Sequence, residues 1–154
     1  MKIFSDAITG EEKQFLSDEH KALVEFYRAF NKQDIKLMQK NWSEFESIMD
    51  NPLGGILRGW ENIQEVYKKI FFGDAKVYVE FYDYSIHKEK EMFFTAGRER
   101  GHIIKNGKKI SLDIRTSRIY AKENGKYRQL HHHGSITDAK LLDTYQKLVM
   151  EEES

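Results

Sequence analysis

The stretch ISLDIRTSRIYAKENGKYRQLHHHGS, residues 110–135, decides the fold of this chain. Two runs rich in strand-forming residues flank the dipeptide Asn124–Gly125. Asn-Gly supplies the positive φ angles of a two-residue type I′ turn, so the stretch predicts a β-hairpin. Pairing outward from such a turn places Arg118 on one strand opposite His131 on the other.

A second Asn-Gly pair, Asn106–Gly107, predicts another hairpin one strand earlier. The runs that we expect as strands are dense in Val, Ile, Phe and Tyr. They cover Lys76 to His87, Met92 to Ile104 and Ile110 to Ala121. Strands of this length twist and curl, so we expect a strongly curved antiparallel sheet.

The first half of the chain predicts three helices. A capping box from Thr9 to Glu12 indicates the start of the first, whose apolar residues recur at helical spacing as far as Phe30. Asp34 is the N-cap that we expect for a short second helix, and the third follows Gly59. The apolar stripe of the third helix consists of Ile63, Val66, Tyr67, Ile70 and Phe71.

Together these elements predict one α+β domain, a roll in which the three N-terminal helices close the mouth of a curved antiparallel sheet. A chain of 154 residues requires no second domain, so we assign 1–154 to one domain with a core of about 18–136. Asp138 is an N-cap candidate for a last amphipathic helix over about 138–152, which ends in the acidic run Glu151–Glu153.

The composition excludes several classes of protein. With 25 Lys and Arg against 25 Asp and Glu, the chain lacks the basic excess of a nucleic-acid-binding protein. Its longest run without a charged residue, Gln129 to Thr137, is shorter than the roughly 18 residues of a membrane helix. The absence of Cys excludes disulfides, thiolate metal sites and a Cys nucleophile. Because no secretory signal is visible, a cytoplasmic location is the default.

A polar cluster is predicted on the apolar face of the 110–135 hairpin. Arg118, His131 and His133 share this face in a regular register, because side chains alternate with period two. The register of the preceding hairpin adds Glu99, which is a suitable counter-charge for a buried guanidinium. Arg118 then either forms an ion pair within the chain or binds an anionic ligand. A position at the end of a strand, with the charged group in water, is the alternative.

The run of three histidines allows two chemistries. On a strand, His131 and His133 lie on one face about 6.6 to 7 Å apart, while His132 points the other way. Two imidazoles do not complete a metal site, so we predict no metal. Either of the two suits a general base, with structural hydrogen bonding as the alternative. Trp42 and Tyr67, on or beside the helical stripes, line either a cavity or the plain core.

The order of the elements and one motif resemble the nuclear transport factor 2-like superfamily, which includes SnoaL-like cyclases, ketosteroid isomerases and the association domain of calcium/calmodulin-dependent protein kinase II. The resemblance covers about Asp18 to Ile136. It implies a cystatin-like, cone-shaped roll with a cavity between helices and sheet, and a homodimer formed through the outer sheet face. Its most specific segments, similar to the association domain, are Ser117-Arg118-Ile119-Tyr120, Asn124-Gly125-Lys126-Tyr127 and His131-His132-His133-Gly134-Ser135.

Two positions depart from the ketosteroid isomerases. Their proton-abstracting base is an Asp directly before a Pro, and here that position is Asn51, which takes up no proton at neutral pH. Asp50 is one residue away and is expected to project to the opposite face. The isomerase Tyr that stabilises the oxyanion falls on Phe26. The resemblance therefore does not imply isomerase chemistry for this chain.

In the kinase association domain, arginines line the cavity. Arg118 matches one of them and Arg98 a second, whereas a third position is Gly134 here. The resemblance places Arg98 inside, but the regular register turns it to the other face, opposite Arg115. A three-residue turn with a bulge would reverse this orientation.

We therefore predict a protein that binds a small organic molecule, anionic or not, without a cofactor and without an assigned catalytic residue. One alternative is a SnoaL-like isomerase, cyclase or dehydratase with His131 or His133 as general base. Another is an oligomerising scaffold with a filled interior. The candidate ligand-binding residues are Arg118, His131, His133, Asn51, Trp42, Tyr67 and Arg98.

Overall fold

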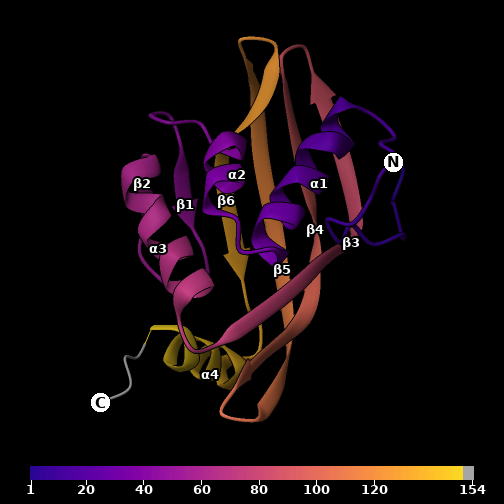
Figure 1. Ribbon diagram of the computed structural model, residues 1–154. Coiled ribbons are helices and arrows are strands. Elements are labelled where there is room, and N and C mark those ends of the chain that lie inside the picture. The colour runs from indigo at the N-terminus through magenta and orange to yellow at the C-terminus, as the bar shows by residue number, and fades with distance from the viewer. Residues whose placement is uncertain (151–154) are drawn as a thin grey trace.

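The described residues, 1–150, form a six-stranded sheet with helices against one of its faces in this computed structural model (Figure 1). The strand order is β2-β1-β6-β5-β4-β3, and neighbours are antiparallel except β1 and β6, which are parallel. The predicted α+β roll is confirmed. The strands are β1 (Ile48–Asp50), β2 (Leu57–Arg58), β3 (Lys76–Glu89), β4 (Met92–Lys105), β5 (Lys108–Glu123) and β6 (Lys126–Ser135).

Four helices accompany the sheet in this part of the chain: α1 (Asp18–Asn31), α2 (Ile35–Asn41), α3 (Trp60–Phe72) and α4 (Ala139–Met150). The N-cap side chain of Asp34 accepts the amide of Leu37 at 3.0 Å, and that of Asp138 accepts the amide of Leu141 at 2.8 Å. Such bonds satisfy amides that a helix start leaves unpaired. α3 begins at Trp60, directly after Gly59. The predicted starts of α2, α3 and α4 are confirmed.

The first helix begins at Asp18 and not at the predicted capping box. The box itself forms, with the amide of Thr9 donating to the Glu12 carboxylate at 2.9 Å. It does not continue as a helix, because Arg28 donates to the carbonyl oxygens of Gly10 and Glu12 at 2.8 and 2.5 Å. Gly10 also has a φ of 93°, outside the helical region. The apolar residues just before Asp18 are consequently exposed.

Both Asn-Gly turns form as predicted, but only one hairpin keeps its regular register. The β4–β5 pairing is regular from its turn to its far end. The β5–β6 pairing is regular as far as Tyr120 and Gln129, and beyond that point Ile119 pairs with His131. Leu130 is therefore the extra residue of a β-bulge. A slip of one residue turns every later side chain of β6 to the opposite face.

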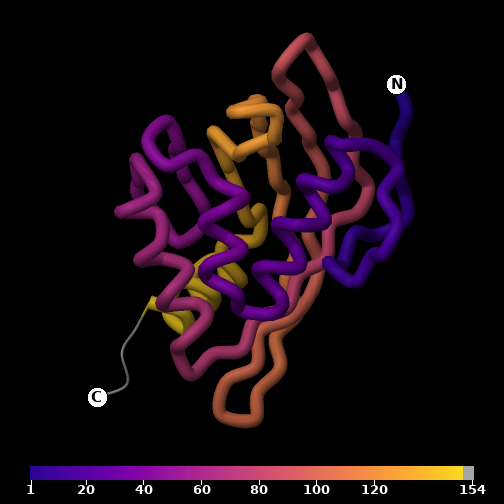
Figure 2. The backbone as a smooth tube through the Cα atoms, turned by 45° about the horizontal axis from the view of Figure 1, so that its top comes forward, coloured from indigo at the N-terminus to yellow at the C-terminus, as the bar shows by residue number. Residues whose placement is uncertain are grey.

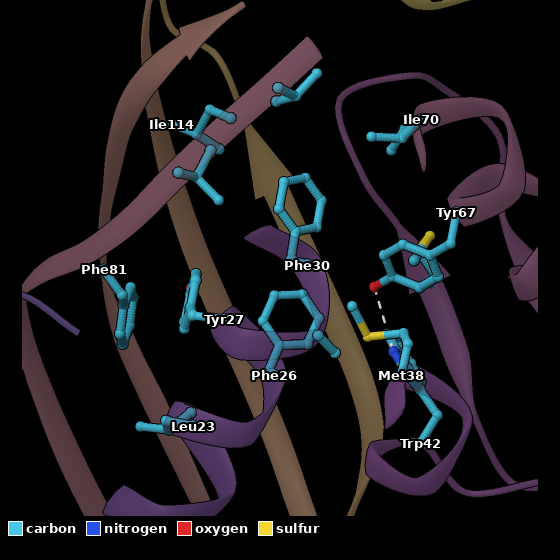
Figure 3. Packing of buried hydrophobic residues seen from close by; sticks show 14 of the residues in the cluster. Leu23, Phe26, Tyr27, Phe30, Met38, Trp42, Tyr67, Ile70, Phe81 and Ile114 are labelled. Atoms are coloured by element: carbon cyan, nitrogen blue, oxygen red, sulfur yellow. Dashed lines mark hydrogen bonds between the residues drawn. The ribbon is translucent and has the colours of Figure 1, made fainter. Parts of the chain in front are cut away.

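The core is an aromatic cluster between α1, α3 and the sheet (Figure 3). The rings of Tyr27 and Phe81 stack with centroids 5.5 Å apart, and Phe26 meets Tyr67 edge to face. Each aromatic side chain buries roughly 150 to 250 Å², so a few of them supply most of the apolar contact. This cluster fixes α1 and α3 over the concave face of the sheet.

The N-terminal segment covers the outer edge of the sheet at β3 (Figure 2). The amide of Phe4 donates to the carbonyl of Tyr84 at 2.8 Å, and that of Ile8 to Phe81 at 2.7 Å. β3 is irregular between Tyr82 and Ser85. The added pairing satisfies backbone groups that an edge strand would otherwise expose.

Helix α4 lies across the open end of the roll, next to α3 (Figure 1). Tyr145 is its only buried residue within 139–150. The amide of the Gln146 side chain donates to the carbonyl of Pro52 at 2.9 Å, which ties α4 to the loop after β1. The predicted acidic run Glu151–Glu153 lies outside the described residues.

Candidate functional site

Arg118 lies at the centre of the concave sheet face and is 1% exposed. β5 places it there because the alternate residues Ile114 and Thr116 also point inward. Its Nη1 donates to Gln129 Oε1 at 2.7 Å, and its guanidinium carbon lies 3.6 Å from the ring centroid of Phe26. A charge buried this deeply requires partners of this kind.

Glu99 supplies the opposite charge, as the register of the β4–β5 hairpin predicts. Its Oε2 lies 3.6 Å from Arg118 Nη2, and its other carboxylate oxygen accepts a short hydrogen bond from the hydroxyl of Thr116. Burial by itself lowers the pKa of Arg118, but the electrostatic effects of the neighbouring Tyr27 and of the Glu99 carboxylate outweigh burial, and the pKa is raised. Arg118 therefore remains a cation inside the roll.

His132 faces Arg118 from β6. The predicted pairing of Arg118 with His131 is wrong, because the bulge at Leu130 shifts the register by one residue. His132 is 6% exposed, and burial together with the positive charge of Arg118 lowers its pKa well below the ordinary value. The side chain is therefore a neutral imidazole at neutral pH.

A cavity of about 40 Å³ separates this cluster from the helices. Its polar wall contains Arg118, Glu99 and His132, and Tyr145 of α4 lines it as well. One water needs roughly 10 to 15 Å³ on this measure, whereas pockets for organic ligands span about 300 to 1,000 Å³. In the conformation described, the cavity has room for a few waters and not for an organic ligand.

Three buried polar atoms in or beside the cavity have no hydrogen-bond partner among residues 1–150. They are Arg118 Nε, His132 Nδ1 and the hydroxyl oxygen of Tyr27. Burial raises the pKa of Tyr27 well above its ordinary value, so its hydroxyl keeps the proton. An unsatisfied buried group costs about 1 to 3 kcal/mol, and native proteins contain few of them. These atoms are therefore where water or a ligand would bind.

Three further candidate residues, Tyr67, Trp42 and Asn51, lie on or behind the wall of the cavity. Tyr67 lines it, and its hydroxyl accepts a hydrogen bond from Trp42 Nε1 at 3.2 Å, shown as a dashed line in Figure 3. Trp42 is fully buried behind Tyr67 and does not line the cavity. Asn51 lines it at the end of β1, with its side-chain oxygen accepting the amide of Leu53 at 3.0 Å.

The bulge turns His131 and His133 to the outer face of the sheet, away from Arg118. There both bind Asp50, with His131 Nε2 at 2.8 Å and His133 Nδ1 at 2.6 Å from its carboxylate oxygens. Partial burial raises the pKa of Asp50, but these two hydrogen bonds outweigh it and leave the pKa lowered. The predicted outward orientation of Asp50 is confirmed, and the structure does not bring the two histidines into the cavity.

Arg98 also lies on the outer face, opposite Arg115. The regular two-residue turn forms, so the orientation from the register is confirmed and the inward position implied by the family resemblance is wrong. Arg98 Nε donates to Asp83 Oδ2 at 3.2 Å. Among the predicted residues, the structure therefore joins Arg118, Tyr67 and Asn51 around one cavity.

The interior cluster combines a fixed cation, a carboxylate and a neutral imidazole. A guanidinium donates to carbonyl oxygens, and a neutral imidazole either accepts or donates a proton. Within residues 1–150, no three side chains of the metal-binding types are placed to hold a metal ion. The chemistry that these residues offer is polar recognition and proton transfer.

The comparisons with known proteins agree with this geometry. A model of the SnoaL-like domain matches residues 20–139. The chain belongs to the SnoaL-like domain family. Comparison of this SnoaL-like domain with curated proteins gave no significant match. None of its helices within 1–150 is long and apolar enough to cross a membrane.

Three solved structures share the fold. A Caulobacter vibrioides protein with a cystatin-like fold has a TM-score of 0.65 at 15% identity, over 82% of this chain and 92% of that one. A Salmonella enterica nuclear transport factor 2-like superfamily protein has a TM-score of 0.67 at 21% identity, over 77% and 90%. The S. rosetta hub of calcium/calmodulin-dependent protein kinase II has a TM-score of 0.65 at 10% identity, over 77% and 93%.

Two residues of the cavity escaped the sequence argument. His132 was expected to point outward, and only the bulge at Leu130 reverses it. Nothing in the hairpin sequence marks that bulge. Tyr145 belongs to the expected last amphipathic helix, but the packing of α4 over the cavity is a long-range contact. A Tyr among aliphatic residues indicates a polar neighbour, because a buried Tyr hydroxyl usually has a hydrogen-bond partner.

Proposed function

We propose that this SnoaL-like domain binds a small, uncharged, polar organic molecule between Arg118 and His132. The observation that carries the proposal is the pair of unpartnered atoms, Arg118 Nε and His132 Nδ1, both buried beside one cavity. A carbonyl or hydroxyl oxygen of a ligand would accept from the guanidinium and pair with the imidazole. Such a ligand would supply hydrogen bonds to two buried polar atoms that otherwise have none.

The charge of the cluster favours a neutral ligand over an anion. Glu99 already lies 3.6 Å from the guanidinium of Arg118, so the charges of the two side chains balance. A second anion in the same cavity would be repelled by Glu99, and at low dielectric this repulsion is strong. Of the ligands compatible with the sequence, a neutral one therefore fits the cavity better than an anion.

A ligand of this kind also requires movement of α4. The cavity of about 40 Å³ is too small for an organic molecule, and the ring of Tyr145 lines it. Because Tyr145 is the only buried residue of α4 within 139–150, α4 can move away at a lower cost than the other helices. We therefore treat α4 as the cover of the site.

The test uses acetamide and acetate, which have nearly the same shape but differ in charge. Ligand-observed NMR with the Tyr145→Ala chain is expected to show saturable acetamide binding that is weaker in wild type, with Tyr145→Phe as the matched control. Amide shifts should locate the site at β5 and β6. Tighter binding of acetate, or no binding to the enlarged cavity, would contradict the proposal.

A second candidate is acid–base catalysis with His132 as the base. The observation in its favour is that burial and Arg118 hold this imidazole neutral by lowering its pKa, in the same cavity as the Glu99 carboxylate. His132 takes the place of His131 and His133, which lie on the other face. Once a substrate is found, His132→Gln should abolish turnover while binding persists; unchanged turnover excludes the role.

We also propose that two copies pair through the outer sheet face. Met92 and Phe94 are 44% and 49% exposed there, beside Ile119 in a shallow apolar groove. An isologous contact would cover this patch with its own copy. Sedimentation velocity of wild type should show a dimer that Phe94→Ser dissociates, with Phe72→Ser, exposed on α3, as the control. A monomeric wild type at high concentration would overturn the pairing.

A further inference from the structure

The outer sheet face carries a second polar site, centred on two arginines that stand directly opposite each other. Arg98 on β4 pairs in register with Arg115 on β5. Like charges directly opposite each other on neighbouring strands repel and destabilise the sheet. A carboxylate or another anion between them would remove this cost.

The chain itself supplies only part of that negative charge. Asp83 accepts a single hydrogen bond from Arg98 Nε, at 3.2 Å. Arg115 forms no salt bridge within the described residues. The neighbouring Arg100, by contrast, has its own partner, because its Nε lies 2.7 Å from the Glu80 carboxylate. The two guanidinium groups of Arg98 and Arg115 therefore have one carboxylate partner between them, Asp83.

The two arginines line a groove of about 400 Å³, together with Asp83, His133, Ser117 and Ser135. His133 is held in place by Asp50, which accepts from its Nδ1 at 2.6 Å. A carboxylate only accepts hydrogen bonds, so Nδ1 donates to Asp50, and Nε2 of the neutral ring is then an acceptor that offers an anion no hydrogen bond. The serine hydroxyls add neutral donors on the same surface. The groove thus contains two guanidinium groups and two serine hydroxyls as donors for an oxyanion, with the carboxylate of Asp83 as the competing anion.

We propose that this Arg98–Arg115 groove binds a small oxyanion, the carboxylate or phosphate group of a soluble molecule. The site is separate from the interior cavity, because the two lie on opposite faces of the sheet. The inference therefore does not rest on the ligand proposed for Arg118. Both arginines are exposed, so the affinity depends on salt and is weak.

The experiment is an NMR titration of the full chain with inorganic phosphate and, separately, with acetate, at low ionic strength. We expect saturable shifts of the Arg98 and Arg115 Nε–H signals and of the Ser117 amide. Saturation by both anions indicates a general oxyanion site, and saturation by phosphate alone indicates a phosphate site. Linear, unsaturable shifts with both anions would overturn the proposal.

Matched variants distinguish a specific anion site from a general effect of the anion on surface charges. Arg115→Gln should weaken phosphate binding by at least about fivefold, whereas Arg100→Gln, one pair further along the same face, should leave it unchanged. Asp83→Asn should strengthen it, because the competing carboxylate is lost. Asp83 has a φ of 49°, which Asn tolerates. Equal weakening in Arg115→Gln and Arg100→Gln would overturn the proposal.

The same titration is repeated in the Phe94→Ser chain, which keeps the outer face free of a second copy. The groove needs one copy only, so phosphate binding should persist in this variant. Loss of binding there, with an intact amide spectrum, would mean that the site belongs to the interface and not to the single chain.

Discussion

The carboxylate of Glu99 lies 3.6 Å from the guanidinium of Arg118, and both side chains are almost completely buried. Breaking a buried pair leaves an uncompensated charge, which typically costs about 3 to 5 kcal/mol. We expect Glu99→Gln to lower the free energy of unfolding by about 3 kcal/mol, because the amide keeps the shape but not the charge. Urea denaturation measures the change.

The matched control for this prediction is Glu80→Gln, which breaks the more exposed pair between Glu80 and Arg100 on the outer face. Exposed pairs are screened by water and contribute little, so the loss in Glu80→Gln should be clearly smaller. Adding Arg118→Met to Glu99→Gln should restore part of the loss, because no charge then remains buried. Equal costs for the two single variants would show that Arg118 does not depend on Glu99.

His132 makes stability depend on pH. Its pKa is lowered in the folded state by burial and by Arg118, so the unfolded chain binds more protons below the ordinary pKa near 6.5. Stability should therefore fall as the pH drops below about 6.5, with a slope of up to roughly 1.4 kcal/mol per pH unit. Urea denaturation between pH 4.5 and 7.5, a window of about three units around that pKa, measures the slope. His132→Asn should flatten it, and an unchanged slope would assign the dependence to other groups.

Gly101 is required by the close approach of β3 and β4. A Cβ at this position would overlap the carbonyl oxygen of Tyr78 on the neighbouring strand. Gly101→Ala should therefore cost about 3 kcal/mol or more. Gly107→Ala is the control, because its surroundings are open and only its φ of 76° opposes a side chain, at about 1 kcal/mol. Thermal unfolding of both variants distinguishes packing from backbone strain.

Features set by residues close together in the sequence were predictable, whereas features set by contacts between distant residues were not. The Asn-Gly turns, the Asp34 and Asp138 caps and the inward position of Arg118 depend on neighbouring residues, and all are confirmed. The start of α1 is wrong because Arg28, far along the chain, binds the carbonyls of the preceding turn.

The candidate site was half predictable for the same reason. Arg118 and Glu99 meet because the β4–β5 hairpin is regular, whereas His132 replaces His131 because β6 contains a bulge. The parallel pairing of β1 with β6, which brings Asp50 to His133, depends on the whole sheet. A local rule for turns contains no information on either of these features.

The attachment of α4 rests largely on Tyr145, and this makes a local opening measurable. Tyr145→Ala removes the only buried side chain of α4 within 139–150, so we expect hydrogen exchange to accelerate across α4. The amides of β5 around Arg118 should keep their protection, because the aromatic cluster and the Glu99 pair are intact. Leu148→Ala, which removes a partly buried side chain of the same helix, should have a smaller effect. If α4 and β5 instead lost protection together, α4 would open only with the whole fold, and it could not serve as the cover of the cavity.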